Sequence, residues 1–155
     1  KDGNVSLDSQ FSFKNSYSAF PSVKGESIFS ANYSISYEER DLFYKMLGKG
    51  ISEEVPFMFV AAAIPSTLLQ MSTISGGRPE GAYGGIDLSF FSDPRCGDYQ
   101  SKIYLIGKPR KTDKGSLYRF EGIVSQDGSP LARGKILVYS QEEFSLERIK
   151  QIQAA

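Results

Sequence analysis

The chain has 155 residues and a formal net charge of zero, and it contains one cysteine and no histidine. Without an imidazole, Ser-His-Asp and Cys-His hydrolases and histidine-based zinc sites are excluded from this chain. The charge balance argues against a nucleic-acid partner, and Cys96 has no second cysteine to pair with. The start of the chain is polar, without the apolar region of a secretory signal. We therefore expect one cytoplasmic domain with no cofactor and no metal.

Two short elements are predicted before the most apolar part of the chain. Residues 1–27 are polar and are interpreted as an N-terminal arm. Alternating apolar residues at 28–35 predict a strand. Ser36 as N-cap, Glu39 at the capping-box position and Gly48 after the last turn predict a short amphipathic helix. Its expected apolar face consists of Leu42, Phe43, Met46 and Leu47.

Residues 55–71 form the most apolar segment and predict a buried helix. Pro56 suits a first helical turn, whereas Pro65 removes one internal hydrogen bond and predicts a kink. We expect a nearby hydroxyl to satisfy the carbonyl that Pro65 frees, and the alanines at 61–63 to permit close approach of a sheet. The segment is too short and too interrupted for a membrane span, so no membrane partner is expected.

The second half of the chain changes to strand-like runs separated by turns. The turns at 111–115 and 125–130, the latter with Asp127-Gly128, are typical of hairpins, so the strands are expected to be antiparallel. A charged helix is predicted to begin near Ser140. The expected strands lie in 84–94, 98–108, 116–128 and 130–140.

One apolar helix followed by strands joined this tightly predicts an α+β fold, in which an antiparallel sheet wraps around the central helix. This layout is that of the hotdog fold. The expected domain covers 28–140, between the arm at 1–27 and a C-terminal helical extension at 141–155. Other strand orders remain open at this point.

Three stretches resemble the MaoC-like acyl-thioester hydratase/dehydratase family, a branch of the hotdog superfamily. The resemblance spans roughly 28–140 and rests on turn and packing motifs. These are "GGIDLSFFSDPRCGDYQSKIYLIGK" with Phe90, Phe91, Pro94, Arg95, Gly97 and Asp98, "VSQDGSPLARGKILVY" with Gln126, Asp127, Gly128, Ala132, Arg133 and Gly134, and "SISYEERDLFYKMLG".

The resemblance implies binding of an acyl-CoA or acyl-carrier-protein thioester, and (R)-specific enoyl-thioester hydratase or 3-hydroxyacyl dehydratase chemistry. Active members carry an Asp and a His after the short helix, but here Gly48 is followed by "KGISEEVPFMF". We therefore expect a hotdog protein without the usual dyad. It would act as a homodimer, or as a heterodimer with a hotdog paralogue that supplies the missing residues. The alternative is a histidine-free acyl-thioester hydrolase, a thioesterase.

Three carboxylates are the candidate catalytic bases of such a hydrolase. Glu53 and Glu54 precede the apolar helix, where a pocket raises a carboxyl pKa, or where the acids simply oppose the helix dipole. Asp87 interrupts an apolar strand and faces either an acyl pocket or solvent. Asp93, Cys96 and Asp98 are explained by turn chemistry alone.

Two further groups are candidates for substrate binding. Ser66, Thr67 and Gln70 are polar residues within the apolar helix, and they either line the site of the thioester carbonyl or bond back to the helix. Basic residues cluster at a predicted hairpin, where they bind the phosphates of coenzyme A or phosphopantetheine, or form a solvated turn. The substrate-binding candidates there are Lys108 and Arg110, beside Lys111 and Lys114.

Overall fold

The computed structural model describes residues 23, 25–75, 82–141 and 143–155, so nearly all of the predicted arm at 1–27 lies outside the described residues. The described part is an α+β structure. Its elements are β1 (Phe29–Ile35), α1 (Tyr37–Met46), α2 (Phe57–Ile74), β2 (Ala82–Phe90), β3 (Gly97–Leu105), β4 (Arg110–Thr112), β5 (Gly115–Gln126), β6 (Ser129–Ser140) and α3 (Leu146–Ala154).

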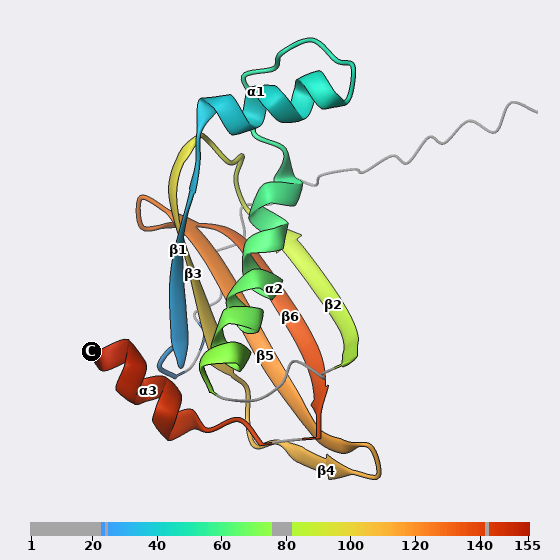
Figure 1. Ribbon diagram of the computed structural model, residues 1–155, viewed down its shortest axis with the longest axis vertical. Coiled ribbons are helices and arrows are strands. Elements are labelled where there is room, and N and C mark those ends of the chain that lie inside the picture. Colours follow the sequence, from blue (N-terminus) through green and yellow to red (C-terminus); the bar gives the residue numbers. More distant parts are fainter. Residues whose placement is uncertain (1–22, 24, 76–81, 142) are drawn as a thin grey trace, which may run out of the picture.

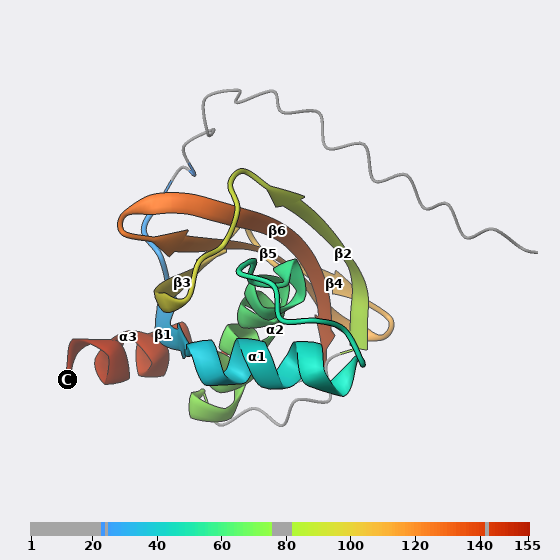
Figure 2. The same cartoon turned by 90° about the horizontal axis from the view of Figure 1, so that it is seen from above.

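One antiparallel sheet wraps around the long helix α2. The strand order is β1-β3-β5-β6-β2, and the short strand β4 pairs with β5 outside this path. Seen from above, the sheet curls around α2 on its concave side (Figure 2). In Figure 1, α1 lies across one end of the sheet, while β4 and α3 lie at the other end. The expected hotdog layout is confirmed.

Glycines on two strands allow α2 to approach the sheet. Gly122 of β5 and Gly134 of β6 are cross-strand neighbours. A Cβ atom at Gly122 would lie 2.3 Å from Ile64 Cγ2, and one at Gly134 would lie 2.9 Å from Ile64 Cδ1. Ile64 is fully buried in the space that these two residues leave open. The expectation for the alanines is wrong at Ala62, whose side chain is exposed.

Pro65 lies inside α2, and the helix continues unbroken from Phe57 to Ile74. Pro65 has no N–H group for the carbonyl of Ala61, four residues earlier. The Thr67 hydroxyl donates to the carbonyl of Ala63 at 2.6 Å, so it does not bond the carbonyl that Pro65 frees, contrary to expectation. By length and a mean hydropathy of 1.5, α2 would suffice to cross a membrane, but here it packs as a core helix on the sheet.

The predicted capping box begins α1, but the predicted apolar face of this helix is mostly exposed. Ser36 Oγ accepts from the Glu39 N–H, and the Glu39 carboxylate accepts from the Ser36 N–H at 2.8 Å. Phe43 packs against Phe59 with ring centroids 5.3 Å apart. The other expected members of the apolar face point outward, with exposed fractions of 57% for Leu42, 78% for Met46 and 52% for Leu47.

The C-terminal helix begins later than predicted and completes the core. Ser140 ends β6, and α3 begins at Leu146 with Ser145 as its N-cap, so the predicted start near Ser140 is wrong. Phe144 contacts the ring of Tyr118 edge-on at 4.8 Å, and Ile149 is fully buried. The segment at 143–155 therefore contributes to the core at the β4 end of the sheet.

The two turn motifs that carry the family resemblance lie together. In the turn before β3, the carbonyl of Arg95 accepts from Gln126 Nε2 at 3.0 Å and also from the Tyr99 hydroxyl. The Arg95 guanidinium pairs with Asp127 at 3.0 Å. Asp127 and Gly128 have φ angles of 51° and 76°, as a two-residue hairpin of type I′ requires. These motifs therefore hold two loops of the sheet in register.

Candidate functional site

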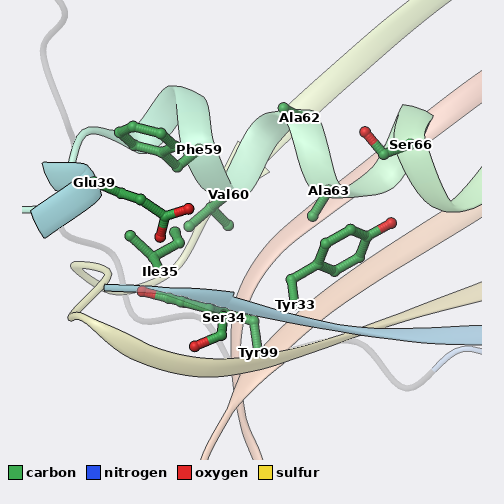
Figure 3. A pocket seen from close by; sticks show the side chains of 10 residues that line it. All are labelled: Tyr33, Ser34, Ile35, Glu39, Phe59, Val60, Ala62, Ala63, Ser66 and Tyr99. Atoms are coloured by element: carbon green, nitrogen blue, oxygen red, sulfur yellow. The ribbon is translucent and has the colours of Figure 1, made fainter. Parts of the chain in front are cut away.

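A pocket of about 160 Å³ lies where β1 and the start of α1 meet the first half of α2 (Figure 3). Apolar side chains form most of its wall, and hydroxyl groups and one carboxylate supply the polar part. The lining residues are Tyr33, Ser34, Ile35, Glu39, Phe59, Val60, Ala62, Ala63, Ser66 and Tyr99. Strand β1 presents Tyr33 and Ile35 toward the helix because alternate residues of a strand share one face.

Tyr33 and Thr67 form a directed chain of hydrogen bonds beside this pocket. The single Thr67 hydroxyl proton goes to the carbonyl of Ala63, so Thr67 Oγ1 accepts from the Tyr33 hydroxyl at 2.8 Å. The amide of Gln70 approaches the Tyr33 oxygen from the exposed side at 3.4 Å. Thr67 is fully buried, so this chain fixes the Tyr33 ring against α2.

Burial raises the pKa of the Tyr33 phenol, although the hydrogen bond to Thr67 acts in the opposite direction. At neutral pH the phenol is therefore protonated, and its proton is directed to Thr67. The Tyr33 oxygen accepts a long hydrogen bond from the Gln70 amide, and a ligand N–H or O–H group can take the place of that bond. The residue suits recognition of a donor group better than proton transfer.

Glu39 is the carboxylate that lines the pocket, and the helix cap holds it. Hydrogen bonds from the Ser36 backbone N–H and the Ser36 hydroxyl lower the pKa of Glu39. Both bonds go to the same oxygen, Oε2. A carboxylate with a lowered pKa is a poor general base near pH 7. Glu39 therefore stabilises α1 and places a negative charge at the pocket rim.

The predicted catalytic carboxylates do not line this pocket. Glu53 and Glu54 are exposed in the loop before α2, where their backbone carbonyls accept from Arg40 and from the Tyr44 hydroxyl. Asp87 is exposed on β2 opposite Lys135. The structure does not bring these three carboxylates together at the pocket, and their catalytic role stays a prediction.

Asp87 lies on the face of the sheet that points away from α2. Its neighbour Leu88 lies 2.9 Å from where a Gly134 Cβ would be, on the side that Ile64 occupies. Adjacent residues of a strand point to opposite faces, so Asp87 points outward.

The predicted substrate-binding residues fall into two separate places. Ser66 is half-buried on the pocket wall, Thr67 lies behind Tyr33, and Gln70 is exposed beside it. Lys108 and Arg110 are exposed where β3 leads into β4, at the opposite end of the sheet from α1 (Figure 1). Their roles in binding stay predictions.

Sequence reasoning missed two features of the pocket. Tyr33 alternates with Phe29 and Ile35 along β1, and this pattern already placed it on the face toward the helix. Glu39 was assigned to the cap alone, and nothing in the local sequence shows that the cap lies at the mouth of a pocket. Among the described residues, no group of three or more potential His, Cys, Asp or Glu ligands is arranged to hold a metal ion.

No family model matches the chain, and the search of curated proteins found no match. Solved structures do match it. A thioesterase from Thermus thermophilus in complex with coenzyme A and Zn has a TM-score of 0.57 at 11% identity, over 86% of this chain and 98% of that one.

Two further structures have the same architecture. An R-hydratase from Pseudomonas aeruginosa has a TM-score of 0.55 at 21% identity, over 77% of this chain and 84% of that one. A phenylacetic acid degradation-related protein from Ralstonia eutropha has a TM-score of 0.53 at 18% identity, over 76% and 80%. Together with the sheet that wraps α2, these likenesses show that the chain has the hotdog fold.

Proposed function

We propose that this protein binds acyl thioesters of coenzyme A or of an acyl carrier protein in the pocket beside Tyr33, and that it does so without the usual catalytic dyad. The observation that carries the proposal is the pocket itself, which lies against the central helix of a hotdog fold and has an apolar wall with polar groups at its edge. Similar folds include an R-hydratase and a thioesterase in complex with coenzyme A. The MaoC-like motifs of the sequence favour the hydratase/dehydratase type.

The polar groups of the pocket match those of a pantetheine thioester. In Figure 3 the Ser66 hydroxyl and the Tyr33 oxygen lie on the same side of the pocket. We assign Ser66 to the thioester carbonyl, and the Tyr33 oxygen to an amide N–H of the pantetheine arm. Ile35, Phe59 and Val60 supply apolar surface for a short acyl group. With about 160 Å³, the pocket is smaller than the roughly 300 Å³ at which small-molecule sites begin, so it holds only part of the ligand.

The described residues around the pocket do not form an acid–base pair. Dehydration of a 3-hydroxyacyl thioester needs a base at C2 and an acid at the leaving hydroxyl. The Tyr33 proton is directed to Thr67, Glu39 is held by the cap, and the chain has no histidine. A partner subunit that carries the missing residues would complete such a site. This protein would then be a non-catalytic, cytoplasmic partner.

Surfaces that the described chain leaves open support the proposal of a dimer. Strand β2 lies at the edge of the sheet and pairs with β6 only. Within β2, Ile86 is 49% exposed, and α2 exposes Met58 to 57% and Leu69 to 50%. Edge strands with adjacent apolar surface are usually paired. We propose that a second copy, or a hotdog paralogue, covers this surface.

A histidine-free thioesterase is the second candidate, favoured by the thioesterase among the similar structures. Its base would be Asp87, Glu53 or Glu54. None of these three lines the pocket, so this candidate needs a different site of hydrolysis.

Butyryl-CoA tests the proposal in a titration of the isotope-labelled full chain by NMR. We expect the amide signals of Ala62 and Ser66 to shift, and Ser66→Ala to weaken binding about five- to tenfold, as loss of one hydrogen bond does. Thr73→Ala removes another hydroxyl of α2 and serves as the matched control with unchanged affinity. No binding of butyryl-CoA or butyryl-pantetheine, or equal loss in both variants, contradicts the proposal. Release of free thiol in the same samples would favour the thioesterase.

A further inference from the structure

A groove of about 520 Å³ lies on the outer face of the sheet, away from α2. Gly122 and Gly134 face Ile64 on the inner side of the sheet. Glu121 is adjacent to Gly122 in β5 and Lys135 is adjacent to Gly134 in β6, so both point outward. The groove crosses β2, β6 and β5 and ends beyond β3. It is lined by Gly85, Ile86, Asp87, Ile106, Arg119, Phe120, Glu121, Lys135, Ile136 and Leu137.

Two cross-strand rows of residues give this groove its shape. One row contains Gly85, Leu137 and Arg119 as direct neighbours on three strands. Space is open where a Gly85 side chain would lie, since no atom comes within 4 Å of its Cβ position. Leu137 is 38% exposed, and half-buried Ile106 lies at the far end. Gly85 and Leu137 therefore form a short apolar trough that begins at the edge strand and ends at Arg119, and Ile106 lies on the far side of Arg119.

The second row contains Asp87, Lys135 and Glu121, and together with Arg119 of the first row it leaves positive charge available. Glu121 is 5% exposed and accepts a hydrogen bond from Arg133, so its charge is already compensated. Arg119 and Lys135 are exposed and have no ion pair among the described residues. Asp87, opposite Lys135, is the remaining exposed acid of the lining.

More cations stand next to the Arg119 end of the trough. A Cβ atom at Gly107 would lie 3.7 Å from Arg119 Nη2, so the connection from β3 to β4 passes beside this guanidinium. Lys108 and Arg110 follow in that connection, and both are exposed. The chain as a whole has no net charge, so this positive excess is local.

We infer that this outer groove is a second ligand site, which takes an amphipathic anion: an apolar chain along Gly85 and Leu137, with a phosphate or carboxylate head at Arg119. A guanidinium binds either head through charge-assisted hydrogen bonds. Burial of an apolar chain in the trough adds favourable binding free energy, which a free inorganic anion cannot gain. The site is distinct from the pocket beside Tyr33, and it does not depend on thioester binding there.

Three ligands with the same chain test this site by NMR on the full-length chain: octyl phosphate, octanoate and octanol. Inorganic phosphate is the fourth probe. We expect one or both of the octyl anions to shift the amide signals of Gly85, Arg119 and Leu137. Octanol lacks the anionic head and inorganic phosphate lacks the apolar chain. Each should therefore bind at least about tenfold more weakly than the octyl anions. Binding of both octyl anions identifies a charge-selective site, and binding of octyl phosphate alone identifies a phosphate-selective one.

Variants of the same chain separate this site from general attraction of anions. Arg119→Gln should weaken binding of the octyl anion at least about tenfold, while Arg148→Gln, on the exposed side of α3, leaves it unchanged. Asp87→Asn removes the opposing charge and should strengthen binding about two- to fivefold. Octanol or inorganic phosphate binding as well as the octyl anions, equal losses in both arginine variants, or shifts confined to Ala62 and Ser66 would overturn the inference.

Discussion

The two sides of α2 have similar composition but different surroundings. The side toward the sheet carries Ile64 and Met71, both fully buried, and the opposite side carries Met58 and Leu69, both at least half exposed. A helix that is apolar all round is expected to be buried all round. Within the described chain, only the first side packs against other residues. The second side also carries large apolar side chains, but they remain exposed. The difference supports our proposal that α2 makes two contacts, one within the chain and one with a partner.

Ala62 shows how this difference changes an expectation. The apolar sequence favours contact with the sheet at this position, where a larger residue would overpack. In the structure the Ala62 side chain is exposed beside the pocket, so Ala62→Leu should leave the stability of the isolated chain within about 0.5 kcal/mol. Urea unfolding of that variant measures the effect directly.

The largest expected effect is on the packed side, at Gly122. In Gly122→Ala the new Cβ would lie 2.3 Å from Ile64 Cγ2, so either α2 or the sheet must move. We expect a loss of about 3 kcal/mol in the free energy of unfolding, at the upper end of overpacking effects. Urea unfolding followed by circular dichroism gives the value.

Gly85→Ala is the matched control, because its Cβ meets no atom within 4 Å and should change stability far less. Ile64→Val in the Gly122→Ala background should recover part of the loss. Equal stability of both glycine variants would show that α2 does not lie against β5 as described.

The open side of α2 gives the next largest effect, on association. Leu69→Lys places a charge on the surface that we assign to the partner, so the dissociation constant of the dimer should rise at least about tenfold. Leu42→Lys, on the exposed side of α1, is the control. Sedimentation at micromolar concentrations measures both, and a wild-type chain that sediments as a stable monomer would refute the two-contact account.

A smaller effect is expected at the hydrogen-bond chain between β1 and α2. Thr67→Val keeps the volume but removes the acceptor for Tyr33 and the donor to Ala63, with an expected loss of about 1–2 kcal/mol. Tyr33→Phe and the double variant complete a thermodynamic cycle. If the two single effects simply add, the residues are not coupled and the inferred chain is wrong.

The smallest effect concerns the cap of α1 and depends on pH. The pKa of Glu39 is lowered in the folded protein by hydrogen bonds from Ser36, so its contribution to stability is present above its ordinary pKa of 4.5. The contribution is lost as the pH falls below that value through the folded pKa. The melting temperature of wild type should therefore exceed that of Glu39→Gln at pH 7, and the difference should shrink by pH 3. A difference that is constant with pH would contradict the cap.

Much of the fold could be predicted from local patterns. The capping box at Ser36, the Asp127-Gly128 hairpin and the alternation along β1 are each determined by neighbours in sequence, and all three are found. Features that depend on contacts between distant segments were not predictable in the same way. The fit of Ile64 against Gly122 and Gly134 joins residues about 60 and 70 positions apart.

The pocket was predicted less well than the fold, because its residues come from segments that are distant in the sequence. Ser66 stood out as a polar residue in an apolar helix, but Tyr33 and Glu39, which line the same pocket, come from other elements. The exposed side of α2 could not be distinguished from the packed side, because Leu68 and Leu69 have the same side chain and differ only in what lies next to them. The start of α3 was misplaced because the charged residues after Ser140 suit a helix and a loop equally well.

The hydration of crotonyl-CoA by the purified chain tests the central claim most directly. The described residues of the pocket form no acid–base pair, and each such group contributes typically 10²–10⁴-fold, so we expect a rate near background together with the binding of butyryl-CoA that we propose. The loss of the enoyl absorbance gives the rate, with short- and medium-chain enoyl thioesters in parallel. Robust turnover by the isolated chain would contradict the account and would require another pair, with Asp87 and Glu53 or Glu54 as the candidates. In that case Asp87→Asn should abolish the activity, and a variant that stays active would exclude Asp87 as well.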